Sequence, residues 1–181
     1  FHGRTLSTMA ATGKTQFQAF FPPVSPGFKH VPFIDIDAIK SQVNDQTVAI
    51  MIELIQGEGG GYEASSDYVH QIRSLCDEKG ILFIIDEVQT SFGRTVKLFA
   101  KDHFDLTPDI MTLGKGIGGG YPLSSMLCRE ALNIFQSGEQ GGTYTAQPMG
   151  MAVGNTVLET LISENLCENA HKMGNDIQSK L

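Results

Sequence analysis

Two short apolar runs, each followed by a charged side chain, constrain the fold of this chain more than any other feature. Residues 81–85 (ILFII) are followed at once by Asp86, and residues 109–113 (DIMTL) are followed by a glycine and Lys115. A short, continuous apolar run is typical of a strand that is buried on both faces of a parallel sheet. Because ligands bind beyond the carboxyl ends of such strands, we expect Asp86 and Lys115 to lie at the same edge of one sheet.

A carboxylate and a lysine at one sheet edge are the pair that pyridoxal phosphate (PLP) requires. A lysine amine condenses with the cofactor's aldehyde as a Schiff base. An aspartate pairs with the protonated pyridine nitrogen, so that the ring withdraws electrons from the substrate carbon. Among the nine lysines, Lys115 is the one that glycines flank directly after an apolar run, where backbone and cofactor can approach closely. The residues therefore favour a PLP site at Asp86 and Lys115. The alternatives are a strand-end carboxylate that caps the following loop and a solvated loop lysine.

The segments around these two residues resemble the class III aminotransferases of PLP fold type I. The resemblance is carried by DEVQTSFGRT from residue 86 and by TPDIMTLGKGIGGGYPLS from residue 107, and it runs over almost the whole chain. It implies an α/β fold, with three α/β/α layers around a mainly parallel sheet. Residues 1–181 would be part of the large PLP-binding domain. Family members are longer on both sides, so we expect an internal fragment.

The resemblance implies a role for each residue of the motif that begins at Asp86. Asp86 would hold the pyridine nitrogen, and Lys115 would carry the Schiff base and move the proton. Val88 would pack on one face of the cofactor ring, and Gln89 would lie near the ring hydroxyl. Because side chains alternate along a strand end, Asp86 and Val88 are expected to project on the same side. Core packing remains an alternative for Val88.

Further cofactor contacts are implied outside that motif. Phe1 matches an aromatic residue that stacks on the other ring face, and His2 belongs to the same motif. Thr143, in a Gly-Gly-Thr-Tyr segment, matches a threonine that reaches the cofactor phosphate of the neighbouring subunit. A hydroxyl and adjacent backbone N–H groups are suitable phosphate donors. The implied protein is a homodimer with shared active sites, and an ordinary Gly-Thr turn is the alternative at Thr143.

Three charged residues match substrate-binding positions of the family. Arg4 corresponds to an arginine that several members use for a substrate carboxylate, a task that suits a planar, bidentate donor. A structural ion pair is the alternative. Glu53 and Glu58 flank Gln-Gly in a segment where the family has Glu-Pro-x-Gln-Gly-Glu, but Leu54 replaces the proline. Glu58 matches a glutamate that pairs with a substrate-carboxylate arginine, which would lie beyond residue 181.

Composition and spacing exclude several other functions. Gly114-x-Gly116-x-x-Gly119 follows a strand like a dinucleotide fingerprint, but Pro122 stands where the helix should begin. An ATPase P-loop ending at Gly13-Lys14-Thr15 fails because Thr8 occupies the place of its first glycine. A net charge of −7 argues against general nucleic-acid binding. Three scattered cysteines are too few for a disulfide framework or a metal site.

The resemblance implies an enzyme that moves an ω-amino group from an acetylornithine-like donor to 2-oxoglutarate, because FHGRTLSTMAATGK from residue 1 and FKHVPFIDIDAI from residue 28 look most similar to that branch. The 4-aminobutyrate and ornithine branches of the family are the alternatives. A catalytically inactive structural fragment is the alternative of another class. No apolar run approaches membrane-spanning length, so no membrane partner is expected. Few cysteines favour a cytoplasmic location, or the mitochondrial matrix in a eukaryote.

Periodicity and turn residues predict an alternation of strands and helices, in keeping with βαβ units. Asp35 or Asp37 could cap the first helix, and Gly80 should end the second. The expected helices are 35–43, 65–79 and 150–166, with helical turns near 98–99 and at 131–135. The expected strands are 47–54, 81–85, 109–113 and 123–128. Irregular segments are expected at 17–32, 90–106 and 138–148.

Overall fold

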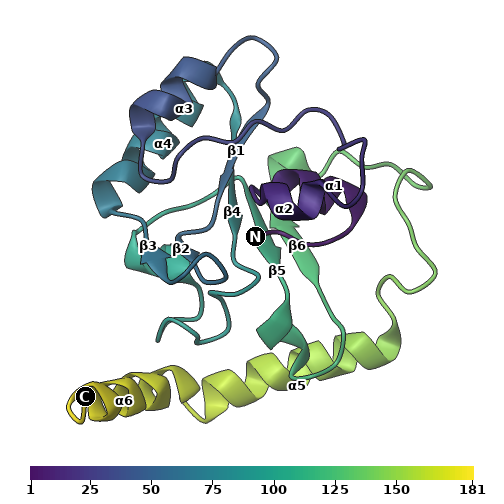
Figure 1. Ribbon diagram of the computed structural model, residues 1–181. Helices are drawn as coiled ribbons and strands as arrows, with labels where there is room; N and C mark the ends of the chain where they lie inside the picture. Colours follow the sequence, from purple (N-terminus) through teal and green to yellow (C-terminus); the bar gives the residue numbers. More distant parts are fainter. The chain divides into compact units, whose positions relative to one another are not determined.

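The computed structural model describes all residues 1–181, and its elements are labelled in Figure 1. The chain divides into two compact units, residues 1–83 and residues 84–181, and each is described by itself. None of the helices combines the length and the apolar character that a membrane crossing requires. The assignment of the whole chain to part of one larger PLP-binding domain stays a prediction.

The first unit holds four helices, of which α3 and α4 lie side by side (Figure 1). The Asp35 side chain caps α3 by accepting a hydrogen bond of 2.8 Å from the Ala38 N–H. Ser65 caps α4 in the same way through the Tyr68 N–H, and Gly80 ends that helix with φ 64°, a left-handed conformation that glycine adopts without strain. The bounds are α1 Leu6–Ala11, α2 Thr15–Gln18, α3 Ile36–Gln42 and α4 Ser66–Lys79.

The core of the first unit is built on one face of α4. Five residues of that helix, spaced at helical intervals, are buried: Tyr68, Val69, Ile72, Leu75 and Cys76. The strand β1 (Ala49–Ile52) runs beside the start of β4 (Leu82–Asp86), where the Leu82 N–H donates to the Val48 carbonyl at 2.9 Å. A short antiparallel pair, β2 (Ile55–Gln56) and β3 (Tyr62–Glu63), encloses the glycine-rich turn between them.

In the second unit, β5 (Ile110–Leu113) pairs with strands on both of its sides. It runs parallel to β4, with Asp86 opposite Thr112, and antiparallel to β6 (Ser125–Cys128). Alternate residues of β4 and β5 are buried, including Ile85, Met111 and Leu113. The α/β class and the mainly parallel sheet expected from the sequence are confirmed.

Two long helices and three 3-10 turns complete the second unit. The helix α5 packs against η2, and α6 follows it at the end of the chain (Figure 1). Pro148 is the first residue of α5, a position where its missing N–H costs nothing. The bounds are η1 Ala100–His103, η2 Lys115–Gly118, η3 Glu130–Leu132, α5 Pro148–Ser163 and α6 Leu166–Gln178.

The structure corrects several of the predicted boundaries. The strand expected at 47–54 is confined to Ala49–Ile52, because Leu54 turns away and its carbonyl instead accepts the Ala64 N–H at 2.8 Å. The helix expected at 150–166 begins and ends earlier. The helical turn placed near 98–99 lies at Ala100–His103. The prediction omitted α6, the β2–β3 pair and α2.

Candidate active site

Asp86 is the last residue of β4 and its carboxylate is buried, with 4% of the residue exposed. Oδ1 accepts hydrogen bonds from the Val88 N–H at 2.9 Å and from the Thr112 hydroxyl at 3.1 Å. Thr112 is the residue opposite Asp86 in the parallel register, so the neighbouring strand itself supplies the second donor. The fold therefore fixes one oxygen of this carboxylate from two sides. Thr112 has no counterpart in the sequence argument, which treated β5 only as an apolar run.

Lys115 follows β5 after a single glycine, so it lies at the same edge as the end of β4. Its side chain is exposed, and Nζ donates a hydrogen bond of 3.1 Å to Oε1 of Gln89. The backbone of Lys115 has φ 43°, in the left-handed region that residues with a Cβ rarely occupy. Such strain is concentrated at functional sites, where the surrounding structure holds it in place. The expected placement of Asp86 and Lys115 is confirmed.

The reason given for the orientation of Val88 is wrong. Because β4 ends at Asp86, the alternation of a strand does not extend to Val88. A turn instead brings the two residues together, since the Val88 N–H bonds the Asp86 carboxylate. The side chain of Val88 approaches Gly114, where an added Cβ would lie 3.1 Å from Val88 Cγ1. Gly114 therefore makes room for Val88 beside the strand that leads to Lys115.

Glu87 is a fully buried carboxylate that the sequence argument did not single out. Its Oε2 accepts from the Thr90 hydroxyl at 2.8 Å and from the Ala100 N–H at 2.9 Å. Oε1 accepts from the Lys101 N–H at 2.8 Å. These bonds connect the start of η1 to the end of β4. The loop that begins with Gln89 lies between these two points in the sequence. The adjacent Asp-Glu pair was the available signal, because an acidic residue directly after a buried strand needs donors.

Phe1 and Arg4 lie together in the first unit. The Arg4 guanidinium carbon is 4.9 Å from the ring centroid of Phe17 and 5.9 Å from that of Phe1. The two rings meet edge to face with centroids 5.9 Å apart. Phe17 is a further residue that the sequence argument missed, since an aromatic residue among prolines carried no motif. Arg4 is exposed and lies against an aromatic pair.

The backbone that follows Phe1 is held by a buried hydroxyl. Thr12 Oγ1 accepts hydrogen bonds from the His2 N–H at 2.9 Å and from the Gly3 N–H at 3.2 Å. Thr12 is itself buried at the end of α1. This contact fixes the path of the chain between Phe1 and Arg4.

The two glutamates expected to bind substrate have different partners. Glu53 accepts a hydrogen bond from the main-chain amino group of Phe1. Glu58 is exposed and forms an ion pair with Lys14. The hydrogen bond and the charge of Lys14 hold the pKa of Glu58 below its ordinary value, and the charge of Arg4 contributes in the same direction.

The residues expected to form one site fall into two groups. Asp86, Val88, Gln89 and Lys115 lie together in the second unit, which also contains Thr143. Thr143 is exposed in the segment between η3 and α5. The residues of the first unit are Phe1, His2, Arg4, Glu53 and Glu58.

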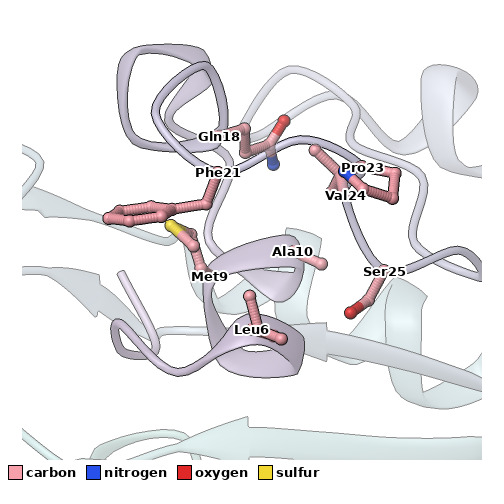
Figure 2. Close-up of a pocket in the computed structure, with 8 residues that line it drawn as sticks. All are labelled: Leu6, Met9, Ala10, Gln18, Phe21, Pro23, Val24 and Ser25. Atoms are coloured by element: carbon pink, nitrogen blue, oxygen red, sulfur yellow. The ribbon is translucent and has the colours of Figure 1, made fainter.

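A shallow surface hollow lies between α1, the end of α2 and the segment up to Ser25. Figure 2 shows the side chains that line it, which are Leu6, Met9, Ala10, Gln18, Phe21, Pro23, Val24 and Ser25. None of them titrates between pH 2 and 12 or belongs to the predicted site. The hollow therefore lacks the groups that acid–base chemistry needs.

Comparison with known proteins identifies relatives over the length of the chain. Residues 1–181 match the protein family described as Aminotransferase class-III. The chain is 44% identical, over 96% of its length, to an acetylornithine aminotransferase of Caldanaerobacter subterraneus. It is 48% identical, over 94% of its length, to acetylornithine aminotransferase 2 of Bordetella pertussis. It spans only 44% and 43% of these two relatives.

Solved structures show the same similarity. An ornithine aminotransferase from Toxoplasma gondii matches the whole chain with a TM-score of 0.92 at 30% identity, over 43% of its own length. That structure is described as having partial occupancy of PLP at its active site. An acetylornithine aminotransferase from Elizabethkingia anophelis covers 85% of the chain with a TM-score of 0.79 at 38% identity, over 40% of its own length.

Proposed function

This chain belongs to the class III aminotransferases, and on that premise we propose that its protein is a PLP-dependent enzyme that transfers the terminal amino group of acetylornithine to 2-oxoglutarate. The observation that carries the proposal is the hydrogen bond between Lys115 Nζ and Gln89, three residues after the buried carboxylate of Asp86. It places a primary amine and a carboxylate at one edge of a parallel strand pair.

The residues of this edge fit PLP by their chemistry. Asp86 offers a buried carboxylate whose position is fixed by two donors, and a carboxylate has acceptor sites enough for a protonated ring nitrogen as well. Val88 offers an apolar surface and Gln89 an amide next to the amine. When bound, PLP supplies an aldehyde that condenses with amines and a ring that withdraws electrons from the substrate carbon.

Lys115 has two tasks in this proposal. Its Nζ would hold the cofactor before the substrate arrives, and the same amine would then serve as the general base for the proton on the substrate carbon that bears the amino group. The hydrogen bond to Gln89 Oε1 orients the amine for both tasks. Only Gly114 separates Lys115 from the end of β5. The left-handed backbone at Lys115 therefore places its side chain directly at the sheet edge, with no loop in between.

The first unit supplies the substrate side of the proposal. Arg4 binds a substrate carboxylate with its planar guanidinium, which the stacked ring of Phe17 keeps in place. Phe1 is the proposed aromatic partner of the cofactor ring, with His2 in the same motif. Glu53 and Glu58 are the proposed acidic residues of the substrate site, with Glu58 as the partner of a substrate-carboxylate arginine. Thr143 is proposed to reach the phosphate of the partner subunit's cofactor, in a homodimer of cytoplasmic location.

Ornithine is the second candidate donor, because the structure of the Toxoplasma gondii ornithine aminotransferase matches the entire chain. The two donors differ at the α-amino group, which carries a positive charge in ornithine and an uncharged acetamide in acetylornithine. The 4-aminobutyrate donor lacks any group at that position. A comparison of kcat/KM for the three donors with 2-oxoglutarate therefore ranks the subgroups.

The decisive experiment is the reduction of the holoenzyme with borohydride, followed by digestion and mass spectrometry. We expect PLP to remain covalently attached to the peptide that contains Lys115, and we expect glutamate to form when acetylornithine and 2-oxoglutarate are supplied. Lys115→Ala should lose both, whereas Lys172→Ala, a change on the exposed surface of α6, should lose neither. Attachment at another lysine, or a wild type without label and without turnover, would show that the proposal is wrong and favour an inactive structural relative.

A further inference from the structure

Thr112 is the single polar residue of β5, whose other members are Ile110, Met111 and Leu113. Met111 and Leu113 are buried, and because side chains alternate along a strand, Thr112 projects from the opposite face. On that face it meets Asp86, which lies opposite it in the parallel register. A valine or an isoleucine would form this strand equally well, so strand formation alone does not account for the hydroxyl.

Thr112 binds two consecutive residues at the end of β4. Its hydroxyl donates a hydrogen bond of 3.1 Å to Asp86 Oδ1, and its carbonyl accepts the Glu87 N–H at 2.9 Å. Glu87 is the first residue beyond β4, so Thr112 extends the contact between the two strands past the last residue of β4. One residue of β5 therefore holds the end of β4 through both its backbone and its side chain.

The sheet leaves the Thr112 hydroxyl little freedom to move. Thr112 has a register partner on each side, Asp86 in β4 and Met126 in β6. Branching at its Cβ restricts rotation about χ1. A donor on a strand that is held from both sides is placed more precisely than a donor on a loop. The position of the hydroxyl is thus set by the same strand that leads to Lys115.

The orientation of the Asp86 carboxylate depends on its donors. The last torsion of an aspartate side chain is broad, so an unconstrained carboxylate turns easily. The Val88 N–H holds Oδ1 from the turn that follows β4, and the Thr112 hydroxyl holds the same oxygen from the neighbouring strand. A ring N–H bonds well only when the acceptor lies close to the line of its bond. The rotation of this carboxylate therefore decides how well Asp86 can bind a protonated ring nitrogen.

We propose that Thr112 is a positioning residue of the cofactor site, whose hydroxyl holds the Asp86 carboxylate in the rotation that accepts the protonated ring nitrogen of PLP. The inference rests on the proposed function and deepens it, because it assigns recognition of the ring nitrogen to the pair of Asp86 and Thr112. Thr112 acts through Asp86 and not by contact with the substrate. Without the hydroxyl, the carboxylate would lose the donor that comes from β5 and would turn more freely.

The test compares the binding of PLP with that of an analogue in which a C–H group replaces the ring nitrogen. Both compounds carry the same aldehyde and phosphate, so a change in the ratio of their dissociation constants between variants isolates the contact of the ring nitrogen. The full-length protein is freed of PLP, and each constant is measured by equilibrium dialysis. The wild type should prefer PLP. Thr112→Val keeps the β-branched shape without the hydroxyl, and it should reduce that preference about tenfold, the size expected for a hydrogen bond to a charged group.

Further variants separate positioning from packing. Thr112→Ser retains the hydroxyl and should retain most of the preference for PLP. Thr112→Ala lacks the hydroxyl and leaves more room than valine, and it should lose the preference as Thr112→Val does. Thr156→Val is the matched control, because the Thr156 hydroxyl lies on the exposed side of α5 and bonds the Ala152 carbonyl of the same helix at 2.9 Å. This change should alter neither dissociation constant.

Equal losses of affinity for PLP and for the analogue in Thr112→Val would show a structural role only and would overturn the inference. A wild type without a preference for PLP, a preference kept by either variant that lacks the hydroxyl, or a preference lost in Thr112→Ser would overturn it as well. A wild type that binds no PLP and forms no glutamate contradicts the proposed function. A wild type that transaminates, with a Thr112→Val variant that keeps the full preference, contradicts the inference only.

Discussion

At Glu87 a carboxylate is fully buried and receives hydrogen bonds from one hydroxyl and two backbone N–H groups. Such bonds to a charged acceptor are stronger than bonds between neutral groups. They also satisfy the N–H groups that begin η1, which have no partner within the turn. Glu87 therefore connects the end of β4 to the far end of the loop that carries Gln89.

Glu87→Gln should lower the free energy of unfolding by about 1–3 kcal/mol, because the new amide NH₂ faces donors and leaves at least one of them unsatisfied. Urea unfolding of the holoenzyme measures the change. The control is Glu159→Gln on the exposed side of α5, which should stay within about 0.5 kcal/mol of the wild type. Equal effects of the two substitutions would mean that the hydrogen bonds of Glu87 do not stabilise the loop.

At the scale of elements, the contact between η2 and α5 requires a residue without a side chain at Gly119. Its φ is 52°, and a Cβ added there would lie 2.8 Å from Cγ2 of Val157. Val157 is β-branched and held in a helix, so it has little freedom to move aside. The same turn begins with Lys115, and the packing of α5 thus supports the backbone from which the side chain of Lys115 projects.

Gly119→Ala should destabilise the protein by about 2–3 kcal/mol, through the left-handed backbone and the clash with Val157 together. Gly174→Ala is the matched control, because it lies inside α6 with open space around its Cα. That substitution should stabilise the helix by up to about 1 kcal/mol. In thermal unfolding, the melting temperature should fall in Gly119→Ala and rise in Gly174→Ala. Shifts of the same sign in both variants would contradict the close approach at Gly119.

Elements with strong local signals were predictable from the sequence, and elements fixed by packing were not. The helix α4 has a serine cap, regular apolar spacing and Gly80 at its end, so its bounds followed directly. The helix α6 has no buried residue, but Leu166, Ala170, Met173 and Ile177 recur at helical intervals, so its periodicity was visible in the sequence and was missed. The pair β2–β3 is two residues long on each side, which is too short for periodicity to be seen.

The same distinction applies to the candidate site. Asp86 and Lys115 could be placed because each directly follows a buried strand, and the parallel register of β4 and β5 then brings them to one edge. Thr112, Glu87 and Phe17 contribute contacts that depend on the fold in three dimensions. Pairing across strands and stacking between distant segments leave no trace in local sequence spacing.

At the scale of the whole molecule, the response of stability to pH depends on buried groups that titrate. Tyr68 is buried in α4 and packs edge to face on Phe33, with ring centroids 6.0 Å apart. Burial raises the pKa of Tyr68 above its ordinary value, because the charged phenolate is disfavoured away from water. The unfolded chain loses this proton first, so the stabilising contribution is complete below about pH 10 and is lost as the pH rises through the folded pKa.

Tyr68→Phe should therefore flatten the decline of stability in alkali. We expect the urea midpoint of the wild type to fall between about pH 9 and pH 11, and that of the variant to fall less over the same range. Tyr62→Phe is the control, since Tyr62 is exposed at the end of the β2–β3 turn and should leave the profile unchanged. A variant profile parallel to the wild type would assign the alkaline response to other groups.

The left-handed backbone at Lys115 has a consequence for how this protein responds to selection. A residue with a Cβ costs about 1–2 kcal/mol in that conformation, and glycine or asparagine would relieve the cost. A mutant library screened only for expression or heat resistance should therefore enrich glycine and asparagine at position 115, and on the proposed role of Lys115 the selected proteins would be robust but inactive. A screen that also demands turnover retains the lysine and must find its gains in robustness elsewhere in the chain.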